Sequence, residues 1–184
     1  NPASEADLLV NDRQRAIVED AFAIAAITPP WQMPSQDDPR HLPEGEATQL
    51  ADNDFSAVKS LARVEDFTLR CYTEDPFAQG AAFGVWDRRR LASMATTTLC
   101  LPGAAQIDNV LTHSDYRRQG YGSAVVSALI TSHRAEGRHV FTVVDQDNTA
   151  AVKFFESLAF ERVRPMYLMH CVLRTLEPEN ARLT

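Results

Sequence analysis

The chain has 184 residues, a formal net charge of −7 and a hydrophobic content of 45%. This length allows one sizeable hydrophobic core and leaves little room for two full domains. The longest apolar run, 21–27, is far shorter than the ~20 residues that a membrane span needs. The acidic balance argues against a nonspecific nucleic-acid surface. We therefore expect a protein with neither a membrane segment nor a nucleic-acid partner.

The cysteines and histidines give no sign of a disulfide framework or a metal site. Cys71, Cys100 and Cys171 are far apart and show no C-x-x-C spacing. An odd number of cysteines suits a reducing compartment, so we expect a cytoplasmic location. The histidines lack metal-ligand spacing and have no Cys or carboxylate cluster beside them, so we expect no metal.

The N-terminal part of the chain divides into a helix pattern and a proline-rich stretch. Residues 12–27 carry apolar side chains at helical spacing up to Thr28, which predicts an amphipathic helix. Residues 29–46 have no period, which predicts a long loop. Within that loop, Trp31 and Met33 either cover an acceptor pocket as a lid or fill a groove on the core.

The middle of the chain predicts a short helix followed by strands. The helix has Asp54 as its N-cap, and residues 67–72 alternate as a strand does. A meander of three further strands is predicted at 82–86, 91–99 and 105–112. The basic run 88–90 between the first two of these strands is more typical of a solvated turn than of a phosphate site.

The C-terminal part alternates helices and strands. A helix is predicted from the glycine turn at 117–122 to a stop at Gly137, then a buried strand at 140–144. A helix beginning after Asn148 and a last strand or strand pair at 161–172 complete the pattern. This order predicts an α/β (α+β) fold with a mixed central sheet.

A glycine turn stands at the start of the helix after the meander: Arg117-Arg118-Gln119-Gly120-Tyr121-Gly122. The glycines lack the Cβ atoms that would hold a phosphate away from the main chain, and the helix N-terminus favours an anion. The arginines add cationic donors. A P-loop lysine is absent, and Val125 stands where a dinucleotide fingerprint needs a small residue, so a nucleotide-binding domain is disfavoured.

Two motifs in order carry a family resemblance. The strand end Val110-Leu111-Thr112 precedes the glycine turn, and 148–160, beginning with Asn148, follows downstream. The stretch 82–172 resembles the GNAT superfamily of acyl-CoA-dependent N-acyltransferases, closest to the FR47-like branch. That resemblance implies two parallel strands, ending at Thr112 and Val144, that splay apart to admit the pantetheine of acetyl-CoA.

The resemblance also implies which residues bind the cofactor. By this resemblance, Arg117 and the main chain from Arg118 to Ser123 bind the pyrophosphate. The strand end Val110-Leu111-Thr112 binds the pantetheine and the acetyl group. The full set is Val110, Leu111, Thr112, Arg117, Arg118, Gln119, Gly120, Tyr121, Gly122, Ser123, Asn148 and Phe155. From its position alone Asn148 is an N-cap, and it can hold both roles.

The catalytic groups are less clear than the cofactor site. Phe155 stands where many members of the family have a tyrosine that protonates the thiolate, and phenylalanine cannot donate; water or one of Tyr72, Tyr116 and Tyr121 would have to substitute. For the base we favour Asp108, which regular alternation would place on one face with Val110 and Thr112. His113 is the alternative base, because the unperturbed pKa of histidine is nearer neutrality. We expect it to lie past the strand and to face solvent.

These expectations combine into a function and a domain division. We predict an N-acetyltransferase that moves an acetyl group from acetyl-CoA to a primary amine by direct attack. The alternative is a catalytically weakened acyl-CoA-binding regulatory module. We expect a helical and loop extension at 1–76, the acetyltransferase core at 77–173 and a polar tail at 174–184. Neither the acceptor nor the oligomeric state follows from the sequence, and a homo-oligomer stays open.

Overall fold

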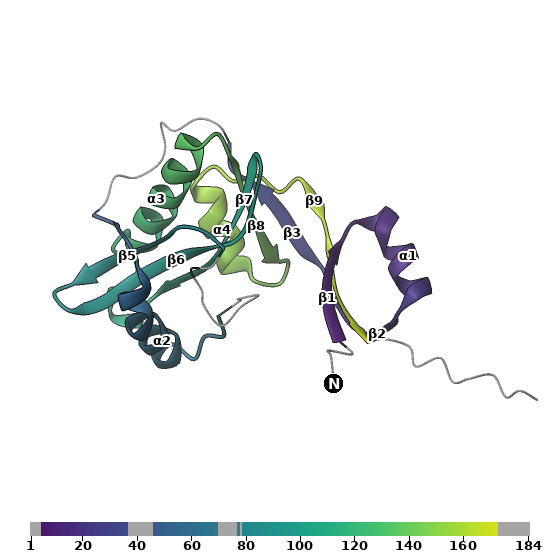
Figure 1. Ribbon diagram of the computed structural model, residues 1–184, viewed down its shortest axis with the longest axis horizontal. Coiled ribbons are helices and arrows are strands. Elements are labelled where there is room, and N and C mark those ends of the chain that lie inside the picture. Colours follow the sequence, from purple (N-terminus) through teal and green to yellow (C-terminus); the bar gives the residue numbers. More distant parts are fainter. Residues whose placement is uncertain (1–4, 37–45, 70–76, 78, 173–184) are drawn as a thin grey trace, which may run out of the picture.

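The computed structural model describes residues 5–36, 46–69, 77 and 79–172 (Figure 1). A seven-stranded mixed sheet forms its centre, in the order β4-β5-β6-β7-β8-β3-β9. The predicted fold class, an α/β protein with a mixed central sheet, is confirmed. The last strand prediction, at 161–172, corresponds to β9 (Arg164–Pro165) and β10 (Tyr167–Val172). The predicted polar tail lies outside the described residues.

The meander and the elements after it lie where the sequence predicts them. Strands β5 (Ala82–Asp87), β6 (Arg90–Leu101) and β7 (Ala104–Thr112) are antiparallel neighbours. Helix α3 (Tyr121–Ala135) leads to β8 (His139–Asp145), which runs parallel to β7. The helix stops where expected, because Gly137 has the positive φ of 74° that suits a helix end.

Helices cover both faces of the central sheet, and each face has its own buried core. On one face α3 and α4 (Thr149–Ser157) pack against the sheet. Their core includes Ala95, Ile107, Val125, Leu129, Val140, Val144, Phe155 and Phe160. On the other face α2 (Phe55–Val64) packs through Val58, Leu61 and Ala62 against Leu91, Met94 and Leu111. The gap between β7 and β8 therefore has α3 and α4 on one side and α2 on the other.

The N-terminal part departs from the sequence prediction. The helix expected at 12–27 ends early, as α1 (Asp12–Ala21), and Ala23–Thr28 form strand β2. The apolar residues after the helix join a sheet with β10, so tertiary pairing overrides the helical spacing. Short elements follow, β4 (Thr48–Gln49) and two 3-10 turns, at Asp52–Asp54 and Ser114–Tyr116.

The proline-rich stretch predicted as a loop contains a central strand. Strand β3 (Pro30–Pro34) pairs with β8 on one side and β9 on the other, with a proline at each end. Met33 is fully buried, and Trp31 packs against the same core. Of the two alternatives for these side chains, the structure shows the filled core position.

The strand predicted at 67–72 and the cap predicted at Asp54 also differ. Residues 67–69 are described and are not a strand, and residues 70–72 lie outside the described part. Asp54 does precede α2, but its side chain accepts the N–H of Ala51 (3.0 Å) and gives that helix no cap. No helix among the described residues is long and apolar enough to span a membrane.

Two strands are exchanged between two sheets. A three-stranded sheet, β1-β10-β2, contains β1 (Glu5–Val10) and stands to one side of the central sheet (Figure 1). Its middle strand, β10, comes from the C-terminal part of the chain, whereas β3, from the N-terminal part, lies between β8 and β9. Segments 5–34 and 139–172 have the same order of strand, helix, strand and strand, and each supplies a strand that lies between two strands of the other.

Candidate active site

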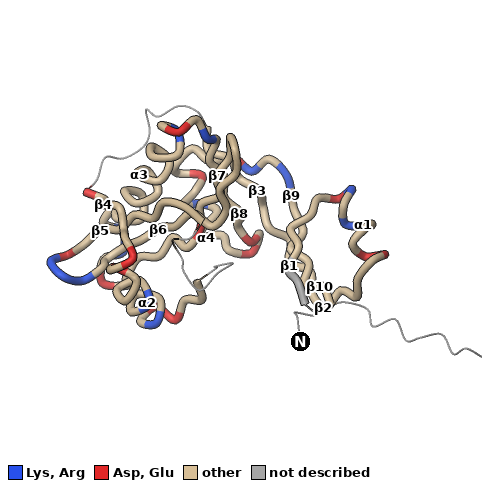
Figure 2. The backbone as a smooth tube through the Cα atoms, in the orientation of Figure 1, with Lys and Arg blue, Asp and Glu red and all other residues tan. Residues whose placement is uncertain are grey.

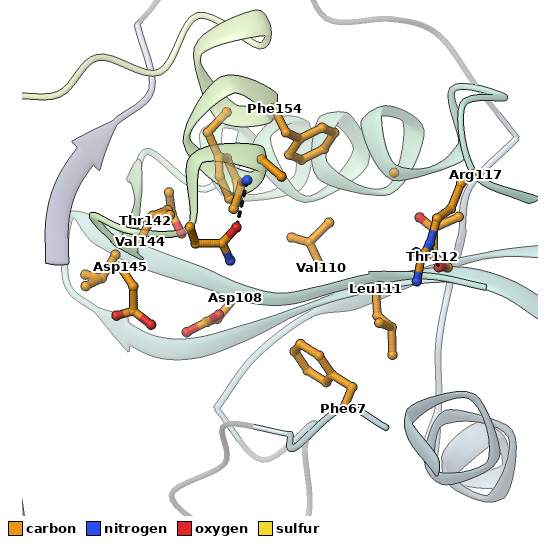
Figure 3. Close-up of a pocket in the computed structure, with 16 residues that line it drawn as sticks. Phe67, Asp108, Val110, Leu111, Thr112, Arg117, Thr142, Val144, Asp145 and Phe154 are labelled. Atoms are coloured by element: carbon orange, nitrogen blue, oxygen red, sulfur yellow. Dashed lines mark hydrogen bonds between the residues drawn. The ribbon is translucent and has the colours of Figure 1, made fainter. Parts of the chain in front are cut away.

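Strands β7 and β8 diverge, and a pocket fills the gap between them (Figure 3). Their parallel ladder runs from the pair Ala104–His139 to the pair Gln106–Phe141. No further pair of the two described strands is bonded, although β7 continues to Thr112 and β8 to Asp145. The pocket has a volume of about 530 Å³. Peptide groups beyond the ladder are thus open to a ligand with an amide-bearing arm.

A β-bulge changes how the residues of β7 face this gap. Met94 and Thr96 of β6 are two residues apart, but their partners Leu111 and Asp108 are three apart. The extra residue is at Asn109, which has a φ of 49°. The regular alternation expected for Asp108, Val110 and Thr112 is therefore wrong: Asp108 shares a face with Leu111, and Val110 and Thr112 take the other. Both faces still line the pocket.

The glycine turn places a helix N-terminus beside the pocket. Gly120 has a φ of 84° and is the residue before α3, whose first intrahelical bond is from the N–H of Ala124 to the carbonyl of Gly120 (2.9 Å). The N–H groups before Ala124 precede that bond and have no acceptor within the helix. A Cβ atom at Gly122 would lie 3.3 Å from Thr112 Oγ1 and 3.5 Å from the Phe154 ring. Gly122 therefore keeps open a space that a side chain would fill.

Arg117 is held by an ion pair that the sequence did not predict. Its Nε donates to the Thr112 carbonyl (3.2 Å), and its guanidinium pairs with Glu65, just after α2. The Glu65 side chain is only 5% exposed and accepts the N–H of Ser114 (2.8 Å). That hydrogen bond, with help from Arg117, lowers the pKa of Glu65. Glu65 thus ties the end of α2 to the segment before the glycine turn.

Helix α4 forms another wall of the pocket. The Asn148 side chain accepts the N–H of Ala151 (3.0 Å), so Asn148 is an N-cap, and it also lines the pocket. Phe155 lines the pocket as well, yet it is 5% exposed and packs edge-to-face with Phe154 (5.2 Å) and Phe160 (5.1 Å). Its ring is at once a core residue and an apolar wall.

The tyrosines considered as substitute acids are engaged elsewhere. The Tyr116 hydroxyl donates to Asp87 (2.7 Å), and that hydrogen bond raises the pKa of Tyr116. Tyr121 stacks on Tyr116 with the ring centroids 6.1 Å apart. Neither lines the pocket. Tyr72 lies outside the described residues.

His113 is not on the solvent side, contrary to the expectation. It is only 7% exposed, and its Nδ1 accepts the N–H of Asp115 (3.2 Å) and lies 3.9 Å from the Glu65 carboxylate. It borders a smaller cavity beneath α2 and does not line the pocket between β7 and β8. Asp108 does line that pocket.

The pocket brings together eight of the residues named from the sequence: Asp108, Val110, Leu111, Thr112, Arg117, Gly122, Asn148 and Phe155. The other five form the turn and the first turn of α3 without lining the pocket: Arg118, Gln119, Gly120, Tyr121 and Ser123. Gln119 donates to the Asp115 carbonyl (3.2 Å). Among the described residues, no group of three or more His, Cys, Asp or Glu could hold a metal ion.

Several lining residues were not among the site residues predicted from the sequence, although Val144 was predicted to end one of the splayed strands: Phe67, Thr142, Val143, Val144, Asp145, Ala150, Ala151 and Phe154. A signal existed for the β8 residues, because the carboxyl ends of neighbouring parallel strands meet at one sheet edge and Asp145 directly follows a predicted buried strand. Phe67 comes from beyond α2, and nothing local indicates its place.

Comparison with known proteins identifies this arrangement. Residues 82–169 match the FR47-like protein family. The matched segment, close to half of the chain, is of the FR47-like kind, and the chain as a whole has the fold of GNAT-superfamily proteins. The splayed strands and the glycine turn belong to the part that matches the FR47-like family.

Solved structures share the fold at low sequence identity. A GNAT-family protein from Novosphingobium aromaticivorans has a TM-score of 0.72 and 21% identity, over 95% of this chain and 77% of that one. A GCN5-related N-acetyltransferase from Kribbella flavida has a TM-score of 0.62 and 17% identity, over 91% and 67%. The ribosomal-protein-S18-alanine N-acetyltransferase from Escherichia coli has a TM-score of 0.54 and 24% identity, over 73% and 96%. No curated protein matches the chain.

Proposed function

We propose that this FR47-like protein is an N-acetyltransferase that moves an acetyl group from acetyl-CoA to a primary amine by direct attack. The observation that carries the proposal is the divergence of β7 and β8 beside the N-terminus of α3, with a pocket of about 530 Å³ between them. We further propose that it works in the cytoplasm.

The residues present fit a CoA-type cofactor. The helix N-terminus favours an anionic diphosphate, and Gly122 leaves a space beside Thr112 and Phe154 that a Cβ would occupy. The unbonded end of β7 suits an amide-bearing arm. When bound, acetyl-CoA supplies the acetyl group as an activated thioester. Arg117 and the main chain from Arg118 to Ser123 would hold its phosphates, and Val110 to Thr112 its pantetheine.

Asp108 is the proposed base. An ammonium acceptor must lose a proton before its lone pair can attack, and Asp108 is a carboxylate of the pocket wall on the strand that ends at Thr112. Its Oδ1 accepts the N–H of Asn109 (2.9 Å), which helps to orient the carboxylate. The amine nitrogen then bonds to the acetyl carbon as the carbon–sulfur bond breaks. A thiol with a pKa near 8.5 is a tolerable leaving group without an acid, consistent with phenylalanine at position 155.

One observation favours a second candidate, an acyl-CoA-binding module with weakened catalysis. Phe155 is built into the core and has no proton to give, and Tyr116 and Tyr121 do not line the pocket. Such a module would bind acyl-CoA without transferring its acyl group to an amine.

The experiment combines CoA titration calorimetry with thiol release from acetyl-CoA over a panel of amines. We expect CoA binding, thiol release that depends on an amine, and a turnover in Asp108→Asn that falls most at low pH, where free amine is scarcest. Binding without amine-dependent release supports the weakened module. Absence of CoA binding refutes both candidates.

A further inference from the structure

The pocket has two chemically different ends. Arg117 lies at one end, beside Thr112 and the glycine turn, and the carboxylates of Asp108 and Asp145 lie at the other (Figure 3). These three are the residues with a formal charge among those that line the pocket. The guanidinium of Arg117 already pairs with Glu65 and bonds the Thr112 carbonyl, so its charge is directed away from the acidic end. Figure 2 shows the acidic residues at the end of β8 beside a largely uncharged sheet.

Strand geometry puts the two carboxylates on the same side of the gap. On β8, Val140 and Val144 belong to the core beneath α3 and α4, so Val143 and Asp145 face the opposite side, that of α2. On β7, the bulge at Asn109 puts Asp108 on the face of Leu111, which packs with α2. The side of α3 and α4, with Gly122 and Asn148, suits the cofactor. The α2 side is left for the acceptor.

A buried hydroxyl in the same gap, on the face of β8 that carries Val140 and Val144, also points to a ligand. Thr142 is 1% exposed and lines the pocket, and its Oγ1 has no hydrogen-bond partner among the described residues. It lies one residue beyond the last bonded pair of β7 and β8, at the narrow end of the gap. A buried hydroxyl without a partner destabilises the protein, and a polar group of a ligand in the gap would satisfy it.

We propose that the acceptor carries two cationic nitrogens, as a diamine does, and that Asp145 binds the nitrogen that does not react. The proposal rests on the proposed function and specifies its substrate class. The reacting ammonium loses one proton to Asp108, and its nitrogen bonds to the acetyl carbon while the carbon–sulfur bond breaks. The second proton passes from the nitrogen to the departing thiolate sulfur, so that the products are the amide and the free thiol of CoA. The other ammonium keeps its charge and stays at Asp145, a specificity-determining residue.

The test compares three probes of similar length: 1,4-diaminobutane, n-butylamine and 4-aminobutanoate. With acetyl-CoA and the full chain, we expect kcat/KM for the diamine to exceed that for butylamine at least tenfold, and 4-aminobutanoate to be the poorest probe. In Asp145→Asn the ratio of diamine to butylamine should fall toward one, mainly through a higher KM for the diamine. Asp147→Asn is the matched control, because Asp147 lies two residues further on, in the turn after β8, is exposed and does not line the pocket. The control should keep the parent's ratio.

The outcomes separate this proposal from the proposed function. Equal kcat/KM for the diamine and butylamine in the parent overturns the dicationic acceptor and leaves N-acetyl transfer standing. A preference that survives in Asp145→Asn overturns the role of Asp145. If no amine reacts, the proposed function fails, and calorimetry with CoA-loaded protein then decides the binding proposal. Tighter binding of the diamine than of butylamine, lost in Asp145→Asn, supports it; equal binding refutes it.

Discussion

The two glycines of the turn differ in what they do, and single alanine substitutions separate them. Gly122 has a helical conformation, and the Cβ of an alanine there meets Thr112 Oγ1 at 3.3 Å and the Phe154 ring at 3.5 Å. The contact with Thr112 needs a shift of a few tenths of an ångström, whereas the contact with Phe154 is an ordinary van der Waals distance. Alanine also favours the helix by up to about 1 kcal/mol over glycine. Gly122→Ala should therefore change the free energy of unfolding by less than about 1 kcal/mol.

The same methyl group should weaken CoA binding strongly. It projects into the space between Thr112 and Phe154, where the proposed cofactor approaches the helix N-terminus. Loss of one hydrogen bond to a charged group costs about 1.5–3 kcal/mol, which corresponds to a Kd roughly 10- to 150-fold higher. Titration calorimetry with CoA measures this change.

Gly120→Ala is the matched comparison. A Cβ there meets nothing within 4 Å, but the φ of 84° strains any residue other than glycine by about 1–2 kcal/mol. For a chain of this length that strain lowers the Tm by about 2–8 °C. We expect Gly120→Ala to lose more stability than Gly122→Ala and to lose less CoA affinity while folded. If Gly122→Ala binds CoA as the parent does, the assignment of this turn to the phosphates is refuted.

Three further predictions concern buried groups. Phe155→Ala should lower the free energy of unfolding by about 3–5 kcal/mol because the ring is buried, whereas Phe155→Tyr should fold normally and raise turnover. Urea melts measure the stability and thiol release measures the turnover. An alanine variant as stable as the parent would contradict the packing of Phe155. Glu65→Gln should lower the free energy of unfolding by about 1 kcal/mol at pH 7. Since the pKa of Glu65 is lowered in the folded state, the difference from the parent in urea melts should vanish as the pH falls well below 4.5. A difference that is constant with pH contradicts this. Burial, then Arg138, lowers the pKa of His133, whose Nε2 lies 2.7 Å from Thr97 Oγ1. The contribution of neutral His133 to the free energy of unfolding is therefore fully present above about pH 6.5 and is lost as the pH falls through the folded pKa. In urea melts from pH 7.5 to 5.5, His133→Asn should show a smaller loss of stability than the parent.

The sequence predicted the elements that local pattern determines. Alternation defined β5 to β7, the positive φ at Gly137 ended α3, and Asn148 capped α4. Each depends on the residues of a single segment, which is why one sequence suffices.

What the sequence did not predict depends on contacts between distant segments. Residues 23–28 have helical spacing but become a strand because β10, some 140 positions later, pairs with them. The bulge at Asn109 shows only in the register of two strands, and it moved Asp108 to the other face. Glu65 reaches Arg117 and Ser114 across 52 and 49 positions, so no local motif could indicate it.

The exchanged strands connect the small sheet mechanically to the active site. Strand β2 ends at Thr28, two residues before β3 begins, and every residue of β3 from Pro30 to Pro34 pairs with β8. The other side of β8 is the pocket wall that carries Thr142 and Asp145. A movement of the β1-β10-β2 sheet is therefore passed to β3, and so to the wall of the site, through the single residue Pro29. A partner that moves that sheet would therefore shift β3 and β8 and change the width of the gap between β7 and β8.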